Sequence, residues 1–121
     1  MDPVQHTTIM REALDKDPNL MLDISWDVIY NAYHEHGAQF VALFNEYPDR
    51  ILPGTDFVAA ANKSPDQYAK ELEVTSRVGR VLSDDAFRKI MLGENYFRLL
   101  GLDYQAPPIC SRPEAKTAPA R

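Results

Sequence analysis

The chain contains 121 residues, of which 45% are hydrophobic and 26% charged, with 13 Lys and Arg against 18 Asp and Glu. This length suits one domain with one hydrophobic core, and the composition excludes a disordered, collagen-like or disulfide-stapled chain. The net charge of −5 gives no electrostatic reason to bind nucleic acid or an anionic membrane surface. The sequence predicts a cytoplasmic protein without a membrane span. Its single cysteine, Cys110, cannot form an internal disulfide, its N-terminus is polar, and it has no long apolar run.

The first part of the chain predicts a helix followed by a strand. Asp2-Pro3 begins the helix with proline at the first helical position, and Asp17-Pro18 ends it because a residue before proline avoids the α region. Residues 19–26 alternate between apolar and polar side chains, with Asp23 and Ser25 on the polar face. This period of two predicts a strand.

A second helical stretch and a second strand follow. Asp27 caps a helix that Gly37 interrupts and Pro48 ends, with apolar side chains at helical spacing on both sides of the glycine. Residues 51–57 then predict a short strand, although Pro53 weakens the pattern.

The next helix has a clear N-terminal signal. Residues 64–67 read Ser-Pro-Asp-Gln, a capping sequence with proline at the first helical position, and the helix extends to about residue 82. We expect four of its apolar side chains to be buried: Tyr68, Leu72, Val78 and Leu82.

Two short helices and a tail complete the predicted elements. Ser83 begins a helix that stops at Gly93, and a last helix extends from Asn95 to Leu100. Residues 105–121 contain several prolines and no periodicity, which predicts a disordered tail.

Strands that are separated by helices predict an α/β fold with parallel pairing and right-handed crossovers. Only two short strands are predicted here, and the remainder is predominantly helical. A sheet of two parallel strands leaves two unpaired edges, so this pattern is typical of a piece of a larger sheet.

Three segments resemble one known family. Pro18–Ser25 reads PNLMLDIS, Arg50–Phe57 reads RILPGTDF, and Lys89–Leu102 reads KIMLGENYFRLLGL. In this order they resemble the last two barrel strands and the closing helix of amidohydrolase-related metal-dependent hydrolases, the branch that includes aminocarboxymuconate-semialdehyde decarboxylase-like enzymes. The chain departs from the family pattern at Pro53, where an aromatic residue is usual, and at Val58, where proline is usual.

The resemblance implies that residues 1–104 are the C-terminal segment of a (β/α)₈ TIM barrel, comprising strands seven and eight with flanking helices. A whole barrel needs about 250 residues, so we expect the rest of the barrel to be missing from this chain. In the family a divalent metal, with zinc the expected ion, is bound by several histidines and by an aspartate at the end of strand eight. Only Asp56 matches one of these positions.

Asp56 is also a candidate from its position alone. It lies at the C-terminal end of the second predicted strand, and this end carries the active site in a barrel. A carboxylate there can bind a divalent metal and accept a proton from a water that the metal activates. Alternatively, Asp56 caps the following loop by accepting hydrogen bonds from the backbone N–H groups of Val58 or Ala59.

Three further residues are candidates for contact with substrate. Asp23 and Ser25 share the inward face of the first predicted strand, where they either contact substrate or form a hydrogen-bonded polar lining. Trp26 at the strand end either lines a substrate pocket or belongs to the core.

The pair His34 and His36 has the His-x-His spacing that binds metals on a strand. The pair follows a helical run, however, and on a helix residues i and i+2 point in directions about 200° apart. We therefore do not expect this pair to bind a metal.

The sequence leaves three classes of function. The first is the C-terminal part of a metal-dependent hydrolase or decarboxylase acting on a small organic molecule, inactive without the remaining barrel. The second is a non-catalytic barrel remnant, and the third is a helical protein-interaction module. The expected partner is the missing N-terminal barrel portion, or a second copy joined through exposed strand edges.

Overall fold

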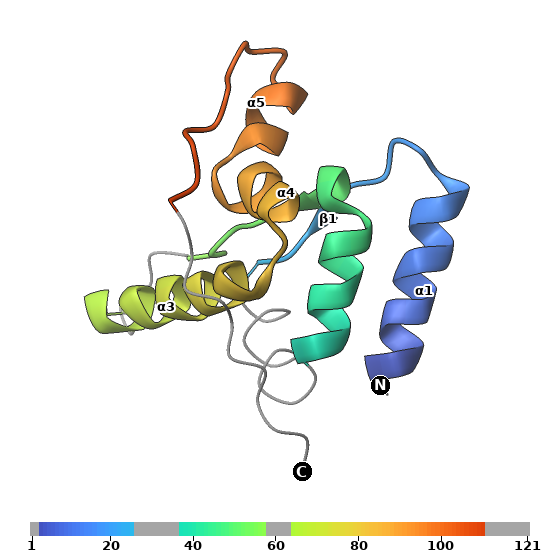
Figure 1. The fold of residues 1–121 in the computed structure, drawn as a ribbon. Coiled ribbons are helices and arrows are strands. Elements are labelled where there is room, and N and C mark those ends of the chain that lie inside the picture. The colour runs from blue at the N-terminus through green and yellow to red at the C-terminus, as the bar shows by residue number, and fades with distance from the viewer. Residues whose placement is uncertain (1–2, 26–36, 58–63, 111–121) are drawn as a thin grey trace.

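The computed structural model describes residues 3–25, 37–57 and 64–110, and this part of the chain is mostly helical with one pair of short strands (Figure 1). A helix without a label in the figure occupies residues 37–46. The other elements are α1 (Pro3–Lys16), β1 (Leu22–Asp23), the 3₁₀ turn η1 (Pro48–Arg50), β2 (Ile51–Leu52), α3 (Pro65–Val81), α4 (Asp84–Ala86), the π-helical turn η2 (Phe87–Met91) and α5 (Glu94–Leu99).

The helix boundaries agree with the local signals in the sequence. At the start of α3, the Ser64 hydroxyl accepts a hydrogen bond from the Gln67 backbone at 3.4 Å, and the Gln67 side chain accepts one from the Ser64 backbone at 2.8 Å. This reciprocal pair is the predicted capping box. The helix over residues 37–46 ends shortly before Pro48, as predicted, whereas its predicted start at Asp27 lies outside the described residues.

The two strands pair in parallel, which confirms the predicted pairing. Leu22 lies opposite Ile51, and Asp23 lies opposite Leu52. The ladder continues one step further, because the Ile24 backbone N–H donates to the Leu52 carbonyl at 2.9 Å.

Both strands are shorter than the predicted ranges 19–26 and 51–57. Before β1, the chain makes a turn in which the Asn19 N–H donates to the Asp17 carboxylate at 2.8 Å, so residue 19 does not join the ladder. After β2, regular pairing ends at Leu52, directly before Pro53. The residues after Ser25 that were assigned to the first strand lie outside the described part.

Two side chains of α5 hydrogen-bond to the edge of β2 that faces away from β1. The backbone groups of successive strand residues point to opposite edges of the strand. Because the Leu52 carbonyl faces β1, the carbonyls of Ile51 and Pro53 face away from β1. The Asn95 amide donates to the Ile51 carbonyl at 2.8 Å, and the Tyr96 hydroxyl donates to the Pro53 carbonyl. Covering an edge in this way reduces the risk of uncontrolled strand addition.

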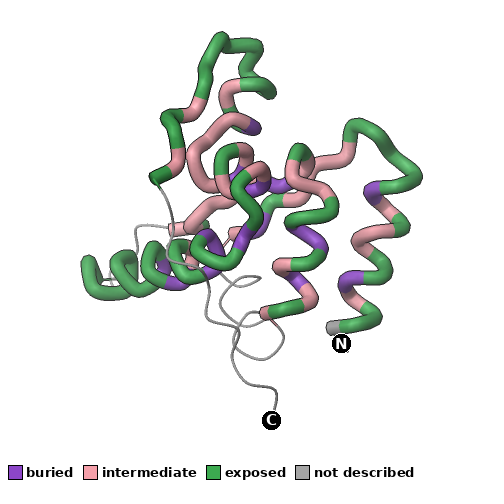
Figure 2. The backbone as a smooth tube through the Cα atoms, viewed as in Figure 1, coloured by how far each residue is buried: buried purple, intermediate pink, exposed green. Residues whose placement is uncertain are grey.

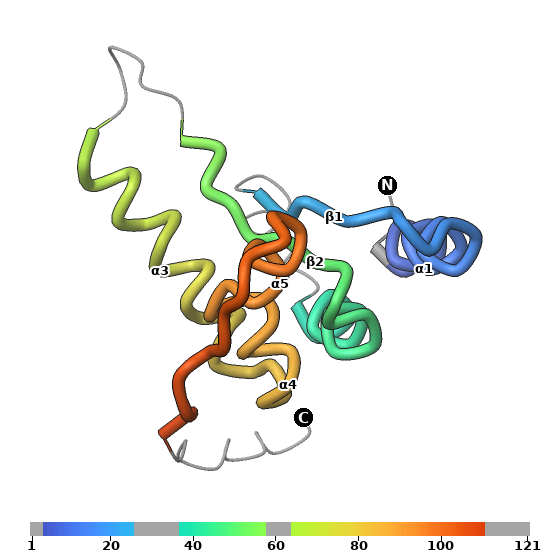
Figure 3. Tube along the Cα trace, turned by 90° about the horizontal axis from the view of Figure 1, so that it is seen from above, coloured from blue at the N-terminus to red at the C-terminus, as the bar shows by residue number. Residues whose placement is uncertain are grey.

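The hydrophobic core joins both strands to the helices around them. In Figures 1 and 3, α1 and the helix over residues 37–46 lie side by side, α3 lies on the other side of the strand pair, and Figure 2 places the buried segments between them. The buried core residues are Leu14, Ile24, Phe40, Leu43, Phe44, Ile51, Val74, Val78, Leu82, Ala86 and Ile90.

The predicted buried face of α3 was only half right. Val78 and Leu82 are 2% and 5% exposed, as expected, but Tyr68 and Leu72 are 41% and 45% exposed. The buried face of the helix instead includes Glu71, Val74 and Val78, at spacings of three and four residues. Tyr68 and Leu72 therefore lie on its flank, where Tyr68 makes an edge contact with the Phe57 ring.

The C-terminal described residues fold back onto α5. The Tyr104 hydroxyl donates to the Leu92 carbonyl at 2.9 Å, and its ring stacks on Phe97 with centroids 4.0 Å apart. Residues 105–110 have no regular secondary structure, and the rest of the tail predicted to be disordered lies outside the described residues. Gly93, with φ of 86°, provides the left-handed turn between η2 and α5.

Candidate functional site

Parallel pairing brings the C-terminal ends of β1 and β2 to the same end of the strand pair. The chain leaving β1 contributes Asp23 and Ser25 there, and the chain leaving β2 contributes Gly54. If a Cβ atom were added to Gly54, it would lie 2.6 Å from the Ser25 hydroxyl oxygen and 3.6 Å from an Asp23 carboxylate oxygen. The structure therefore brings two of the predicted substrate-contacting residues, Asp23 and Ser25, against the end of β2.

Asp23 and Ser25 form a compact hydrogen-bonded turn. The Ser25 backbone N–H donates to the Asp23 Oδ1 atom at 2.8 Å, and the Ser25 hydroxyl donates to the same oxygen. A carboxylate that receives two hydrogen bonds from one neighbour has a fixed orientation. This arrangement agrees with the polar-lining alternative for the pair, and the exposed Asp23 remains accessible from solvent.

Gly54 lies closely against this turn. The space beside it contains the Ser25 hydroxyl and is not open to a metal or substrate. A Cβ contact of 2.6 Å is shorter than non-bonded atoms tolerate, so a larger residue at position 54 would displace at least the Ser25 hydroxyl.

Tyr96 is a member of this site that sequence reasoning missed. Its hydroxyl donates to the Pro53 carbonyl, directly before Gly54. Burial raises the pKa of Tyr96, and the nearby negative charge of Asp23 raises it further. Tyr96 follows Asn95 in the segment that resembles the family's closing helix, and only the contact across more than 40 residues distinguishes it from an ordinary surface tyrosine.

Asp56 lies two residues beyond Gly54 and is exposed. Its φ of 49° is left-handed, a conformation that aspartate adopts more readily than most residues. Within the described residues it makes no hydrogen bond to Asp23, Ser25 or Tyr96. Val58 and Ala59, the donors in the loop-cap alternative, lie outside the described residues.

The described residues do not by themselves form a metal site. No group of three or more His, Cys, Asp or Glu side chains lies close enough together within ranges 3–25, 37–57 and 64–110. A zinc site needs three or four such ligands, and Asp56 could supply only one of them. Three candidates from the sequence, Trp26, His34 and His36, lie outside the described residues.

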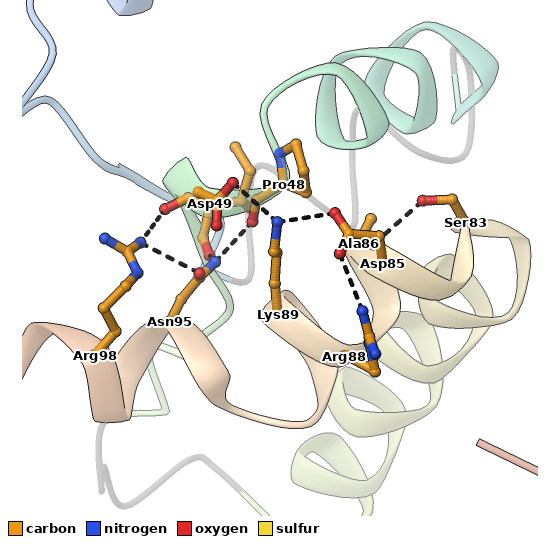
Figure 4. Close-up of polar contacts among 10 residues, drawn as sticks. Pro48, Asp49, Ser83, Asp85, Ala86, Arg88, Lys89, Asn95 and Arg98 are labelled. Atoms are coloured by element: carbon orange, nitrogen blue, oxygen red, sulfur yellow. Dashed lines mark hydrogen bonds and ion pairs between the residues drawn. The ribbon is translucent and has the colours of Figure 1, made fainter. Parts of the chain in front are cut away.

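A second polar cluster lies at the opposite, N-terminal end of β2 (Figure 4). Lys89 Nζ lies 3.0 Å from an Asp49 carboxylate oxygen and 2.9 Å from one of Asp85, while Arg98 donates to the Asp49 carbonyl. The hydrogen bond from Lys89 lowers the pKa of Asp85. For Lys89 itself, burial acts to lower the pKa, but the hydrogen bonds to Asp85 and Asp49 outweigh burial and raise the pKa. The charged side chains of this cluster are paired with one another, so the cluster connects η1 to the C-terminal helices and offers no free reactive group.

Comparison of the chain with protein-family models, curated proteins and solved structures gave no match in any of the three. Among the residues that the structure describes, no helix is long and apolar enough to cross a membrane.

Proposed function

We propose that this chain is the C-terminal part of a metal-dependent hydrolase or decarboxylase that acts on a small organic molecule in the cytoplasm. In this proposal Asp56 is a metal ligand and proton acceptor, and Asp23, Ser25 and Trp26 lie near the substrate. The observation that carries the proposal is the parallel pairing of β1 with β2. This pairing brings the C-terminal ends of both strands to the same end of the strand pair, with Asp23, Ser25 and the chain that leads to Asp56.

Contacts between the three segments that carry the family resemblance also support the proposal. Arg50, at the start of the second segment, donates through Nε to the Leu20 carbonyl of the first at 2.6 Å. Asn95, in the third segment, donates to the Ile51 carbonyl of the second at 2.8 Å. The Arg50 contact is the kind that adjacent barrel strands would make, whereas the Asn95 contact shows only that the third segment lies beside β2.

The proposed metal, zinc, needs ligands that the described residues lack. We propose that they come from the N-terminal barrel portion, which is also the proposed partner of this chain. Because α5 already hydrogen-bonds to the outer edge of β2 at Ile51 and Pro53, the outer edge of β1 is the place where a further strand, or a second copy of the chain, would pair.

A non-catalytic role is the alternative, and one observation favours it. The side chains of Asn95 and Tyr96 cover the edge of β2 that the last strand of a closed barrel would present to the first. A domain finished in this way could act as a barrel remnant or as a helical protein-interaction module without any metal.

Metal content distinguishes the two. The sample is the longest natural polypeptide that contains these residues, purified without added metal and examined by elemental analysis alongside its Asp56→Asn and Asp103→Asn variants. Asp103 is an exposed aspartate near Asp49 and Arg98, on the side of the N-terminal end of β2, so its variant controls for the loss of one charge. The proposal predicts stoichiometric zinc in the parent and in Asp103→Asn, and a clear loss in Asp56→Asn. A parent without metal, or equal metal in all three, would favour the non-catalytic alternative.

A further inference from the structure

A cavity of about 480 Å³ lies between the chain that leaves β2, one face of α3 and the π-helical turn η2. Figure 3 shows the chain after β2 running beside α3. The volume is within the usual range for sites that bind small molecules. Neither Asp56 nor the Asp23–Ser25 turn lines this cavity, so what it binds does not depend on the proposed metal.

The walls of the cavity are mainly apolar. Leu72 of α3 lies on one side, and Phe87 and Met91 of η2 lie on another, with Pro53 at the end of β2. The 45% exposure of Leu72, which the sequence had placed in the core, follows from this position at the cavity wall. Such walls would remove the apolar body of a ligand from water.

The polar groups of the cavity are mostly hydrogen-bond donors. Arg80 contributes a guanidinium group, and Ser76 contributes a hydroxyl. Thr55 accepts a hydrogen bond from the Phe57 backbone at 3.3 Å, which leaves its own O–H free to donate to a ligand. Thr75 differs, because its hydroxyl already donates to the Glu71 carbonyl at 3.0 Å. No acidic side chain lines the cavity among the described residues.

Arg80 stands apart from the other arginines in the described ranges. Each of the others has a polar partner within the protein, whereas Arg80 has neither an ion pair nor a hydrogen bond to another described residue. The partnered arginines are Arg11 with Glu46, Arg50 with the Leu20 carbonyl, Arg77 with Glu73, Arg88 with Asp85 and Arg98 with the Asp49 carbonyl.

We propose that this cavity binds a small monocarboxylate with an apolar body, such as an aromatic or branched aliphatic acid. One guanidinium group matches one carboxylate through two parallel hydrogen bonds. Ser76 and Thr55 donate to the remaining lone pairs, and the apolar body lies against Leu72, Phe87 and Met91. A phosphate fits less well, because its larger charge would have a single cation and its oxygens would face apolar walls.

The test uses benzoate as the probe and the full chain labelled for protein NMR. The matched neutral probe is benzamide, which has almost the same shape, and inorganic phosphate serves as an anion without an apolar body. The proposal predicts saturable benzoate shifts at Arg80, Ser76 and Thr55, with benzamide and phosphate each at least about tenfold weaker, the scale of one charge-assisted contact.

Two variants locate the binding. Arg80→Gln should weaken benzoate binding about tenfold or more, whereas Arg77→Gln, three residues earlier on α3 and paired with Glu73, should leave it unchanged. Ser76→Leu retains Arg80 but fills the cavity from an exposed helix position, so binding should be lost while the fold persists.

Several results would overturn the proposal. Equal binding of benzoate and benzamide would show that charge plays no part, and equal effects of Arg80→Gln and Arg77→Gln would show only general attraction to a basic surface. Benzoate binding that survives Ser76→Leu would place the ligand elsewhere. Binding of phosphate alone would leave a surface anion contact and no carboxylate site.

Discussion

Asn95 and Ile51 are 44 residues apart in the sequence, yet the Asn95 side-chain amide donates a hydrogen bond of 2.8 Å to the Ile51 carbonyl oxygen. The same amide donates to the Pro48 carbonyl at 2.8 Å, and Asn95 is completely buried. The Ile51 carbonyl points away from β1, so at this position the asparagine occupies the place of a neighbouring strand. One side chain thereby fixes α5 against both the 3₁₀ turn before β2 and the outer edge of the strand.

Replacing Asn95 with alanine should therefore destabilise the protein strongly. The change leaves the buried Ile51 carbonyl and the partly buried Pro48 carbonyl without their donor, and an unsatisfied buried group costs about 1–3 kcal/mol. We expect the free energy of unfolding in denaturant to fall by about 2 kcal/mol or more. Asn19→Ala is the matched control because the Asn19 side chain is exposed, and its effect should stay within about 0.5 kcal/mol. Similar losses for the two variants would contradict the structural role assigned to Asn95.

Gly54 and Ser25 provide a test of the close approach at the candidate site. Gly54→Ala should cost about 1–3 kcal/mol, the usual effect of overpacking, because its Cβ would lie 2.6 Å from the Ser25 hydroxyl. Ser25→Ala removes that oxygen and leaves the Ser25 Cβ at an ordinary 3.7 Å. The double variant should accordingly recover much of the stability lost in Gly54→Ala. Denaturant unfolding of all four proteins measures this coupling, and strictly additive losses would show that the two residues do not collide.

The hydrogen bond of Tyr47 predicts that the stability of the fold falls at alkaline pH. Its hydroxyl donates to the Asp15 carboxylate at 2.8 Å, and this hydrogen bond is the main cause that raises the pKa of Tyr47 from 10.0 to about 12. Between these values the unfolded chain has released the proton while the folded protein still holds it. Stability from this group is thus complete below pH 10 and is lost as the pH rises toward 12.

The titration can be followed by tyrosinate absorbance, taken as the difference between the parent and Tyr47→Phe because the chain contains six tyrosines. In the Asp15→Asn background, the same difference should titrate closer to pH 10, since the charge and the strong acceptor are gone. An unchanged titration in that background would mean that Asp15 does not hold the Tyr47 proton.

Local chemistry made much of this fold predictable. Ser64 and Gln67 form their capping box from residues three apart, and Gly93 ends its helix with a left-handed residue, so both signals act without the rest of the fold. Parallel pairing of β1 with β2 was also predicted, because alternation and a helical connection leave few other arrangements.

What the sequence could not provide was the identity of distant neighbours. The flank of α3 that carries Tyr68 and Leu72 is apolar enough for a core, but the other elements pack against the adjacent stripe around Val74. Tyr96 enters the candidate site through a bond to Pro53, and no local pattern reveals that partner. Strand lengths could not be predicted for a similar reason, because how far one strand pairs depends on the path of its distant partner.

The most direct test of the central proposal compares zinc affinity with stability for Asp56→Asn, in the longest natural polypeptide that contains these residues. Zinc affinity is measured by competition with a chelator, and the free energy of unfolding is measured on the metal-free protein. If Asp56 is a metal ligand, zinc affinity should fall by at least about 10-fold to 100-fold, the loss seen even for residues that only orient a ligand, with little change in the free energy of unfolding. If Asp56 only caps the following loop, zinc affinity should be unchanged in Asp56→Asn. Stability should then change little in Asp56→Asn, because the asparagine oxygen still accepts, and should fall by about 1 kcal/mol in Asp56→Ala, which lacks the acceptor. That second result would contradict the assignment of Asp56 to a metal site.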